Sequence, residues 1–131
     1  MTNSLNSMIP AAAALMVLGT MAAASLAPLG LTKRGLWRVP AALSVLFFAA
    51  SLLPIASGGV LGFWTEHVRN DWGNQIFVDL LLCAGSAFFL ILPRARAVGM
   101  NPLLWLLGIG ATGSIGLLAT LARLLYLEEK A

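Results

Sequence analysis

Four apolar segments of bilayer length constrain this chain more than any other feature. A helix needs about 20 predominantly apolar residues to cross the hydrocarbon core of a membrane. The sequence has four runs near this length, at about residues 8–29, 40–57, 75–92 and 102–127. Hydrophobic residues make up 60% of the 131 residues and charged residues 10%, against about 45–50% and about 25% in soluble domains. We therefore expect an all-α fold, an integral membrane four-helix bundle, with residues 1–131 forming a single transmembrane domain.

Capping residues and prolines indicate where these helices begin and end. Ser7 can cap the first run, which places Pro10 in its first turn. The third run is predicted to end before Pro93, because proline interrupts helical hydrogen bonding. Asn101 and Pro102 are a good cap and a good first-turn residue for the fourth run.

The most polar connection spans residues 58–74 and contains Trp64 and Trp72. Tryptophan has the amphipathic shape favoured at the depth of the lipid headgroups. We expect this connection to be a short interfacial helix or an ordered loop.

The basic residues lie near the ends of the predicted spans, and their distribution indicates an orientation. One side carries five of them, Lys33, Arg34, Arg38, Arg94 and Arg96, and the other side carries three, Arg69, Arg123 and Lys130. Lysine and arginine are enriched in cytoplasmic loops. We therefore predict that both termini are non-cytoplasmic. No basic run with interleaved aromatic residues is present, so nucleic acid is not an expected partner, whereas membrane lipids are.

An acid lies inside the third apolar segment. Asp79 shares one helical stripe with Asp71, Gln75, Cys83 and Ser86, because residues four apart lie on one face. A polar stripe of this kind faces the bundle or a wet cavity and not lipid. If the third and fourth spans are antiparallel, Arg123 lies at the depth of Asp79. We predict an Asp79–Arg123 ion pair, which has either a structural role or a role in binding a substrate, proton or ligand. The alternative is that the Arg123 side chain extends to the headgroups and leaves Asp79 alone.

Small residues recur every four positions in the fourth segment, and they indicate close contact between helices. They are Gly108, Thr112, Gly116 and Thr120. Such a groove lets two helix axes approach closely. We expect it to pack on another helix, with Arg123 on the same face.

Acid–base residues gather in the connection before the third segment. Glu66 and His67, together with Asp79, could supply proton-transfer groups above a lipid-filled cleft. The simpler interpretation of "TEHVRND" is a solvated surface loop. No nucleophile elbow, phosphate-binding glycine loop or metal-ligand spacing is present, so we expect no metal and no cofactor.

The second half of the chain resembles a family of small, functionally uncharacterised bacterial membrane proteins with about four spans. The resemblance covers residues 77–129 and rests on "IFVDLLL", "RARAVGMNPLLW" and "GSIGLLATLARLLYLEE". It implies a four-helix membrane fold in the bacterial inner membrane, with a multi-pass topology. It implies no activity, so no catalytic residue follows from it.

Three functions remain open from the sequence. The leading hypothesis is a non-catalytic accessory or structural subunit of a larger membrane complex, or a homo-oligomer, because the chain has almost no soluble mass and no recognisable active-site set. The second is a membrane-embedded enzyme that acts on a lipid or isoprenoid by acid–base chemistry at Asp79. The third is the binding or transport of a small hydrophobic molecule. Expected partners are other membrane protein subunits or further copies of the chain.

Overall fold

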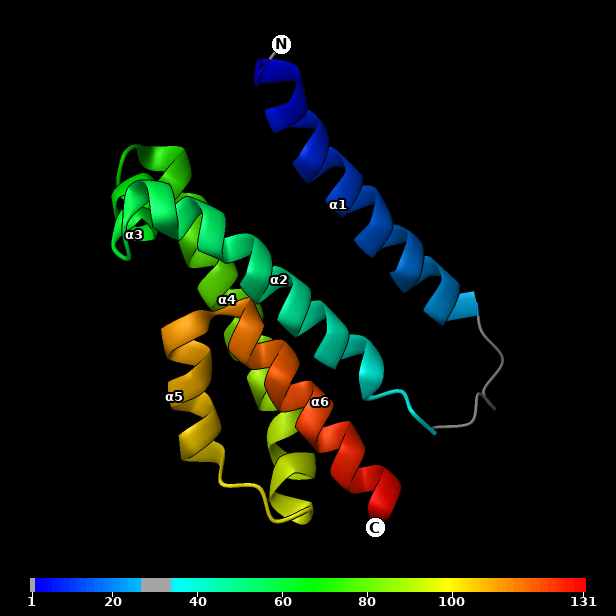
Figure 1. Cartoon of the computed structure of the whole chain (residues 1–131). Coiled ribbons are helices and arrows are strands. Elements are labelled where there is room, and N and C mark those ends of the chain that lie inside the picture. The colour runs from blue at the N-terminus through cyan, green and yellow to red at the C-terminus, as the bar shows by residue number, and fades with distance from the viewer. Residues whose placement is uncertain (1, 27–33) are drawn as a thin grey trace. The chain divides into compact units, whose positions relative to one another are not determined.

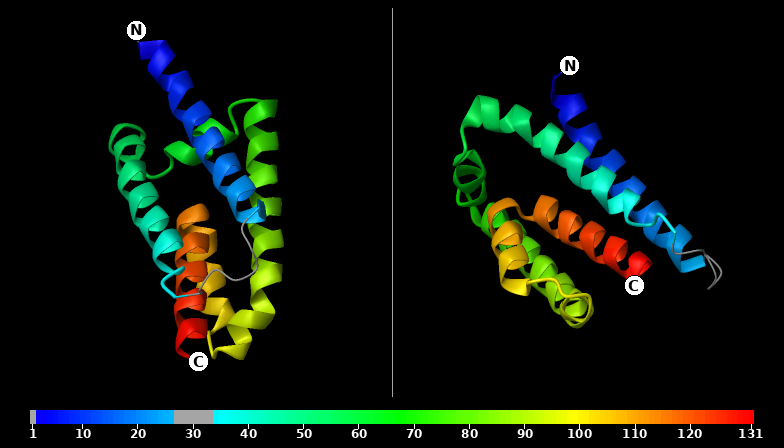
Figure 2. Two further views of the ribbon diagram at one scale, coloured as in Figure 1. Left: turned by 90° about the vertical axis from the view of Figure 1, so that its right-hand side faces the viewer. Right: turned by 60° about the horizontal axis from the view of Figure 1, so that its bottom comes forward.

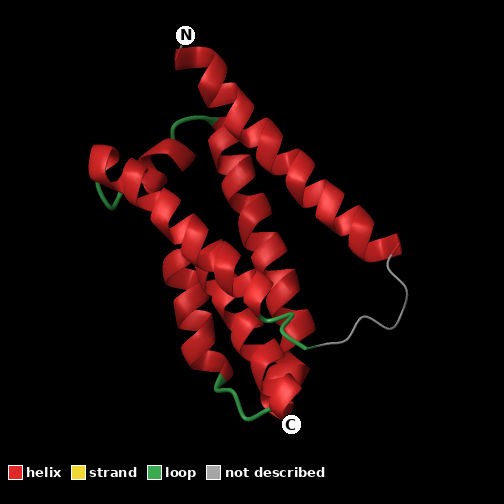
Figure 3. Ribbon diagram, turned by 45° about the vertical axis from the view of Figure 1, so that its right-hand side comes forward, coloured by secondary structure: helices red, strands yellow, loops and turns green. Residues whose placement is uncertain are grey.

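A computed structural model describes residues 2–26 and 34–131, which form six helices and no strand (Figure 1, Figure 3). The chain divides into two compact units, Met1–Thr32 and Lys33–Ala131, where the sequence predicts a single domain. The all-helical class is confirmed.

The first unit contains helix α1, Thr2–Leu26. This helix begins before the predicted Ser7 cap, so Pro10 lies inside it and removes one backbone hydrogen bond there. The Thr20 hydroxyl donates to the carbonyl of Val17 at 2.7 Å, which satisfies it within the helix. The predicted end of this span, residues 27–29, lies outside the described residues, as does Lys33.

The second unit contains five helices. They are α2 (Arg38–Gly58), α3 (Gly62–His67), α4 (Asp71–Ala97), α5 (Pro102–Thr112) and α6 (Ser114–Lys130). Among the described residues, α2 and α4 are long and apolar enough to cross a membrane. The short helix α3 occupies the polar connection. Helix α4 continues through Pro93 to Ala97, so the predicted end before that proline is not where the helix stops.

The segment predicted as one helix over residues 102–127 is instead a helical hairpin. Asn101 caps α5, since its Oδ1 accepts from the backbone N–H of Leu103 at 3.1 Å, as the sequence predicts. The helix then stops at Gly113, which has φ of 60°. That backbone conformation is open to glycine and strained for other residues. α6 follows directly and runs back along α5, and the two lie side by side between α2 and α4 (Figure 2).

The direction of α6 follows from three contacts. The Ser44 hydroxyl on α2 donates to the carbonyl of Ile115 at the start of α6, at 2.9 Å. The Trp37 ring, just before α2, meets Tyr126 near the end of α6, with centroids 5.4 Å apart. α6 is therefore antiparallel to α2. The C-terminal ends of α4 and α6 meet, so these two helices run in the same direction (Figure 1).

The second unit thus has two ends with different composition. The basic end comprises residues 34–38, 94–101 and 123–131, and the α3 end comprises residues 58–72. The hydrophobic core lies towards the basic end, where the fully buried Leu124 of α6 packs with Ile91 and Ala95 of α4 and with Met100.

Candidate functional site

The predicted Asp79–Arg123 ion pair is not formed. Asp79 is exposed on α4 and Arg123 is exposed on α6. The Arg123 guanidinium lies over the ring of Tyr126, 5.6 Å from its centroid and one turn nearer the C-terminus. Within residues 2–26 and 34–131, the ion pairs are Arg69–Glu66 at 3.1 Å and Arg94–Glu128 at 2.6 Å.

The direction of α6 explains why the predicted pair fails. Arg94 and Glu128 are paired, so they lie at the same level. Asp79 precedes Arg94 by about 22 Å along α4, and Arg123 precedes Glu128 by only about 8 Å along α6, at 1.5 Å per residue. The two groups are therefore offset by roughly 15 Å along the helix axes. The prediction assumed antiparallel helices, which would have placed them level.

The polar stripe on α4, defined as Asp71, Gln75, Asp79, Cys83 and Ser86, faces away from the core of the second unit. All five of these side chains are exposed. The residues that α4 directs into the unit lie on its other face and include Phe77, Ala84, Phe88, Ile91 and Ala95. The stripe exists as predicted, but α2, α3, α5 and α6 do not cover it.

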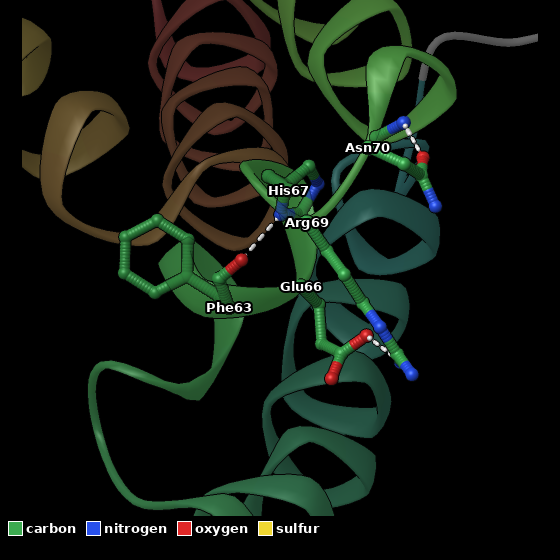
Figure 4. A network of polar contacts seen from close by, with 6 residues as sticks. Phe63, Glu66, His67, Arg69 and Asn70 are labelled. Atoms are coloured by element: carbon green, nitrogen blue, oxygen red, sulfur yellow. Dashed lines mark hydrogen bonds and ion pairs between the residues drawn. The ribbon is translucent and has the colours of Figure 1, made fainter.

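His67 and Glu66 are engaged in local contacts at the corner between α3 and α4 (Figure 4). The Nδ1 atom of His67 lies 2.6 Å from the carbonyl oxygen of Phe63, and its ring lies 5.2 Å from that of Phe77. Glu66 binds Arg69. Asp79 follows Phe77 by two residues, about 200° around the helix, so it points to the opposite face of α4. The three proposed acid–base groups are therefore not brought together.

A close backbone approach holds this corner. The Asn70 side chain caps α4 by accepting from the N–H of Gly73 at 2.8 Å. A Cβ atom at Gly73 would lie 2.5 Å from the carbonyl oxygen of His67, closer than real Cβ atoms come. The corner is therefore held by a close approach of the α3 backbone to the first turn of α4.

The small residues of the predicted groove pack against one another across the hairpin. A Cβ atom at Gly116 would lie 2.5 Å from the carbonyl oxygen of Gly108 and 2.7 Å from the hydroxyl of Thr112. Thr120 is buried and donates to the carbonyl of Gly116 at 2.7 Å. The close contact in the structure is between the two arms of the same hairpin, because the chain reverses at Gly113.

Sequence reasoning missed several residues that hold the helices together. Ser44 is buried and joins α2 to α6. Arg94 and Glu128 form a two-pronged pair with N–O distances of 2.8 and 2.6 Å. A hydroxyl inside the apolar run "PAALSVLFF" was the available signal for Ser44. Arg94 and Glu128 carried no local signal, since their contact depends on the reversal of the chain.

No metal centre forms in the part of the chain that the structure describes. Within it, His, Cys, Asp and Glu side chains nowhere gather in a group of three or more. The described residues thus offer contacts between helices, an exposed polar stripe and a basic end.

Comparison with protein-family models, with curated proteins and with solved structures finds no match to this chain. The resemblance over residues 77–129 therefore stays a prediction.

Proposed function

We propose that this chain is a non-catalytic integral membrane protein whose surfaces bind other membrane helices, as an accessory subunit of a larger complex or as a homo-oligomer. The observation that carries the proposal is the low burial of α2 and α4, the two described helices that are long and apolar enough to cross a membrane. In an 18-residue apolar stretch of each helix, only 11% of the residues of α2 and 6% of those of α4 are buried inside the chain. The core helix of a soluble protein is mostly buried, so apolar helices left this open fit contact with lipid and with neighbouring proteins.

The polar stripe on α4 supports binding to protein as well as to lipid. Hydrocarbon cannot satisfy the carboxylate of Asp79 or the amide of Gln75, and polar groups inside membranes pair with protein or water. Both side chains are exposed on the second unit. A helix that presents hydrogen-bonding groups to this stripe would satisfy them.

The orientation that we propose differs from the one predicted at the C-terminus. The hairpin brings Arg123 and Lys130 to the basic end, where four other basic residues already lie, and Arg69 remains at the α3 end. The four are Arg34, Arg38, Arg94 and Arg96. Since lysine and arginine favour the cytoplasmic side, the basic end and the C-terminus are cytoplasmic in this proposal. The prediction for the N-terminus is unchanged, and the inner membrane of a bacterium is the proposed location.

Cysteine labelling in whole cells tests this orientation. In a Cys83→Ser background, Ala131→Cys and Asn101→Cys are expected to resist a membrane-impermeant maleimide, while Val60→Cys reacts. All three positions are exposed, so accessibility to the reagent depends on the side of the membrane. Equal labelling of Ala131→Cys and Val60→Cys would overturn the hairpin topology.

Purification in a mild detergent tests the binding function. We expect the chain to elute with partner proteins or as an oligomer of its 13.8 kDa protomer. Asp79→Leu should weaken this association, and Leu81→Ala, which changes an exposed residue about 200° around α4 from Asp79, serves as the control for a change outside the stripe. A wild-type chain that always runs as a monomer without partners would contradict the proposal.

The enzymatic and ligand-binding alternatives have no comparable support. His67 and Glu66 lie at the α3–α4 corner and do not converge with Asp79. Unchanged cellular function in an Asp79→Asn variant would remove the acid–base hypothesis, because that variant keeps the shape of the side chain and removes its charge.

A further inference from the structure

Aromatic and basic side chains from α6 and from the start of α2 form a cluster at the basic end. The Trp37 and Tyr126 rings pack edge to face, with an angle of 82° between their planes. The Arg38 guanidinium lies 5.7 Å from the centre of the Trp37 ring. On the other ring, the Lys130 ammonium lies 4.8 Å from the centre of Tyr126, and the guanidinium of Arg123 also lies over this ring. We call these five residues the aromatic–basic cluster.

Within the described part of the chain, the three cations of this cluster form no ion pair with a carboxylate. The nearby acids of α6 have other partners, since Glu128 binds Arg94 and Glu129 accepts from the backbone N–H of Gly35 at 2.9 Å. Neither of the two ion pairs among the described residues includes Arg38, Arg123 or Lys130. All three are exposed. Arg123 and Lys130 lie over the same Tyr126 ring, so their like charges repel and an anion bound beside them would relieve that repulsion.

The aromatic rings indicate that this anion lies at a membrane surface. Tryptophan and tyrosine favour headgroup depth, where the ring meets apolar chains and the N–H or O–H meets polar groups. The Arg123 side chain extends from inside α6 towards its C-terminal end, which is how long basic side chains reach the headgroups. An arginine fork and a lysine ammonium both bind phosphate oxygens well.

The α3 end provides the contrast within the same unit. Its basic residue, Arg69, is paired with Glu66 three residues earlier. It also has tryptophans, Trp64 and Trp72, but the Trp64 ring packs against Phe77 and not near a free cation. Both ends therefore have aromatic residues. Among the described residues, cations that lie over an aromatic ring and have no carboxylate partner are found at the basic end.

We propose that the aromatic–basic cluster binds the headgroup of an anionic phospholipid in the leaflet next to the basic end. The phosphate lies among Arg38, Arg123 and Lys130, and the Trp37 and Tyr126 rings pack against the upper part of the acyl chains. This inference rests on the proposed membrane location. It adds a lipid class that the protein selects.

The experiment uses the full chain purified in a neutral detergent and compares added phosphatidylglycerol with phosphatidylcholine by native mass spectrometry and by thermal unfolding. We expect bound phosphatidylglycerol and a raised Tm, with a smaller effect of phosphatidylcholine. The double variant Arg123→Gln/Lys130→Gln should lose affinity for phosphatidylglycerol by at least about tenfold, the factor for roughly one charge-assisted hydrogen bond. Equal responses to the two lipids, or an unchanged double variant, would overturn the proposal.

Three controls separate this outcome from others. Arg69→Gln, which removes a cation at the α3 end, should bind phosphatidylglycerol as the wild type does, and Arg123→Lys should retain most of the affinity. Inorganic phosphate alone should give no rise in Tm, and an equal rise would assign the cluster to a free anion instead of a lipid. A chain that remains in the membrane fraction of cells but ignores phosphatidylglycerol loses only this inference, whereas a chain absent from that fraction loses the proposed function itself.

Discussion

Helix α4 and the segment from Pro102 to Lys130 are similar in apolar character and differ in structure. Both are predicted to be single long helices. α4 forms one helix of 27 residues, although it contains Pro93 and has Gly85 in its middle. The second segment turns back on itself after the 11 residues of α5. Hydropathy therefore does not distinguish a helix that crosses from a hairpin that returns.

The difference arises from what each glycine contacts. A Cβ atom at Gly85 would meet no atom within 4 Å, so this glycine leaves α4 a continuous helix. Gly113 takes a positive φ that ends α5, and Gly116 then meets the backbone of Gly108 directly. A hairpin needs both features, a residue that can reverse the chain and a site where the two arms can touch.

The largest expected effect is a difference in stability between a variant in the buried core at α6 and a variant on the exposed face of α4. Leu124→Ala removes a fully buried side chain between α6 and α4, and it should lower the free energy of unfolding by about 2–5 kcal/mol. Leu90→Ala on α4, where the residue is 77% exposed, should cost much less. Unfolding of both variants in detergent measures the difference, and equal losses would show that α6 does not pack on α4 in this way.

The next effect tests the contact between the two arms. Gly116→Ala places a Cβ atom against the backbone of Gly108, and overpacking of this kind typically costs about 1–3 kcal/mol. The matched control is Gly108→Ala, whose Cβ atom meets nothing within 4 Å and which improves helix propensity. Thermal unfolding should rank Gly116→Ala below Gly108→Ala, and the reverse order would mean that the arms do not touch at Gly116.

A smaller effect tests how the hairpin is joined to α2. Ser44→Ala removes the hydrogen bond to Ile115 and should cost about 0.5–1.5 kcal/mol. Ser51 lies on the same helix and donates to the carbonyl of Phe47, one turn earlier in that helix, so Ser51→Ala is expected to be nearly neutral. If both variants unfold at the same temperature, the contact between α2 and α6 is not the one described.

The smallest effect concerns the ion pair where α4 and α6 end. Arg94 and Glu128 are partly exposed, so their coupling is expected to be about 0.2–1 kcal/mol. A double-mutant cycle with Arg94→Gln and Glu128→Gln measures this coupling apart from the other contacts of each residue. The coupling should decrease in high salt. A coupling of zero at low salt would argue against parallel ends for the two helices.

The sequence was sufficient for the helical class and for contacts that depend on neighbouring residues. The Asn101 cap and the α3 region followed from local residue types, and the stripe through Asp79 followed from helical spacing. The small residues at Gly108, Thr112, Gly116 and Thr120 indicated close packing without naming the partner. Each of these features depends on residues that lie close together in the sequence.

Contacts between helices could not be predicted, because they depend on the direction of each helix. The prediction missed one reversal, at Gly113, and therefore made the third and fourth spans antiparallel and put Arg123 level with Asp79. The same reversal hid the pairing of Arg94 with Glu128. Glycine is common in apolar helices, and its sequence context does not state which φ it adopts.

The turn at Gly113 also bears on how the protein enters a membrane. If α2 and α4 cross as proposed, the chain after Ala97 goes into the bilayer and comes out on the side from which it entered. Its charged residues, Arg123, Glu128, Glu129 and Lys130, then never have to be translocated across hydrocarbon. About the final quarter of the protein, residues 98–131, can then be inserted after α4 is already in place.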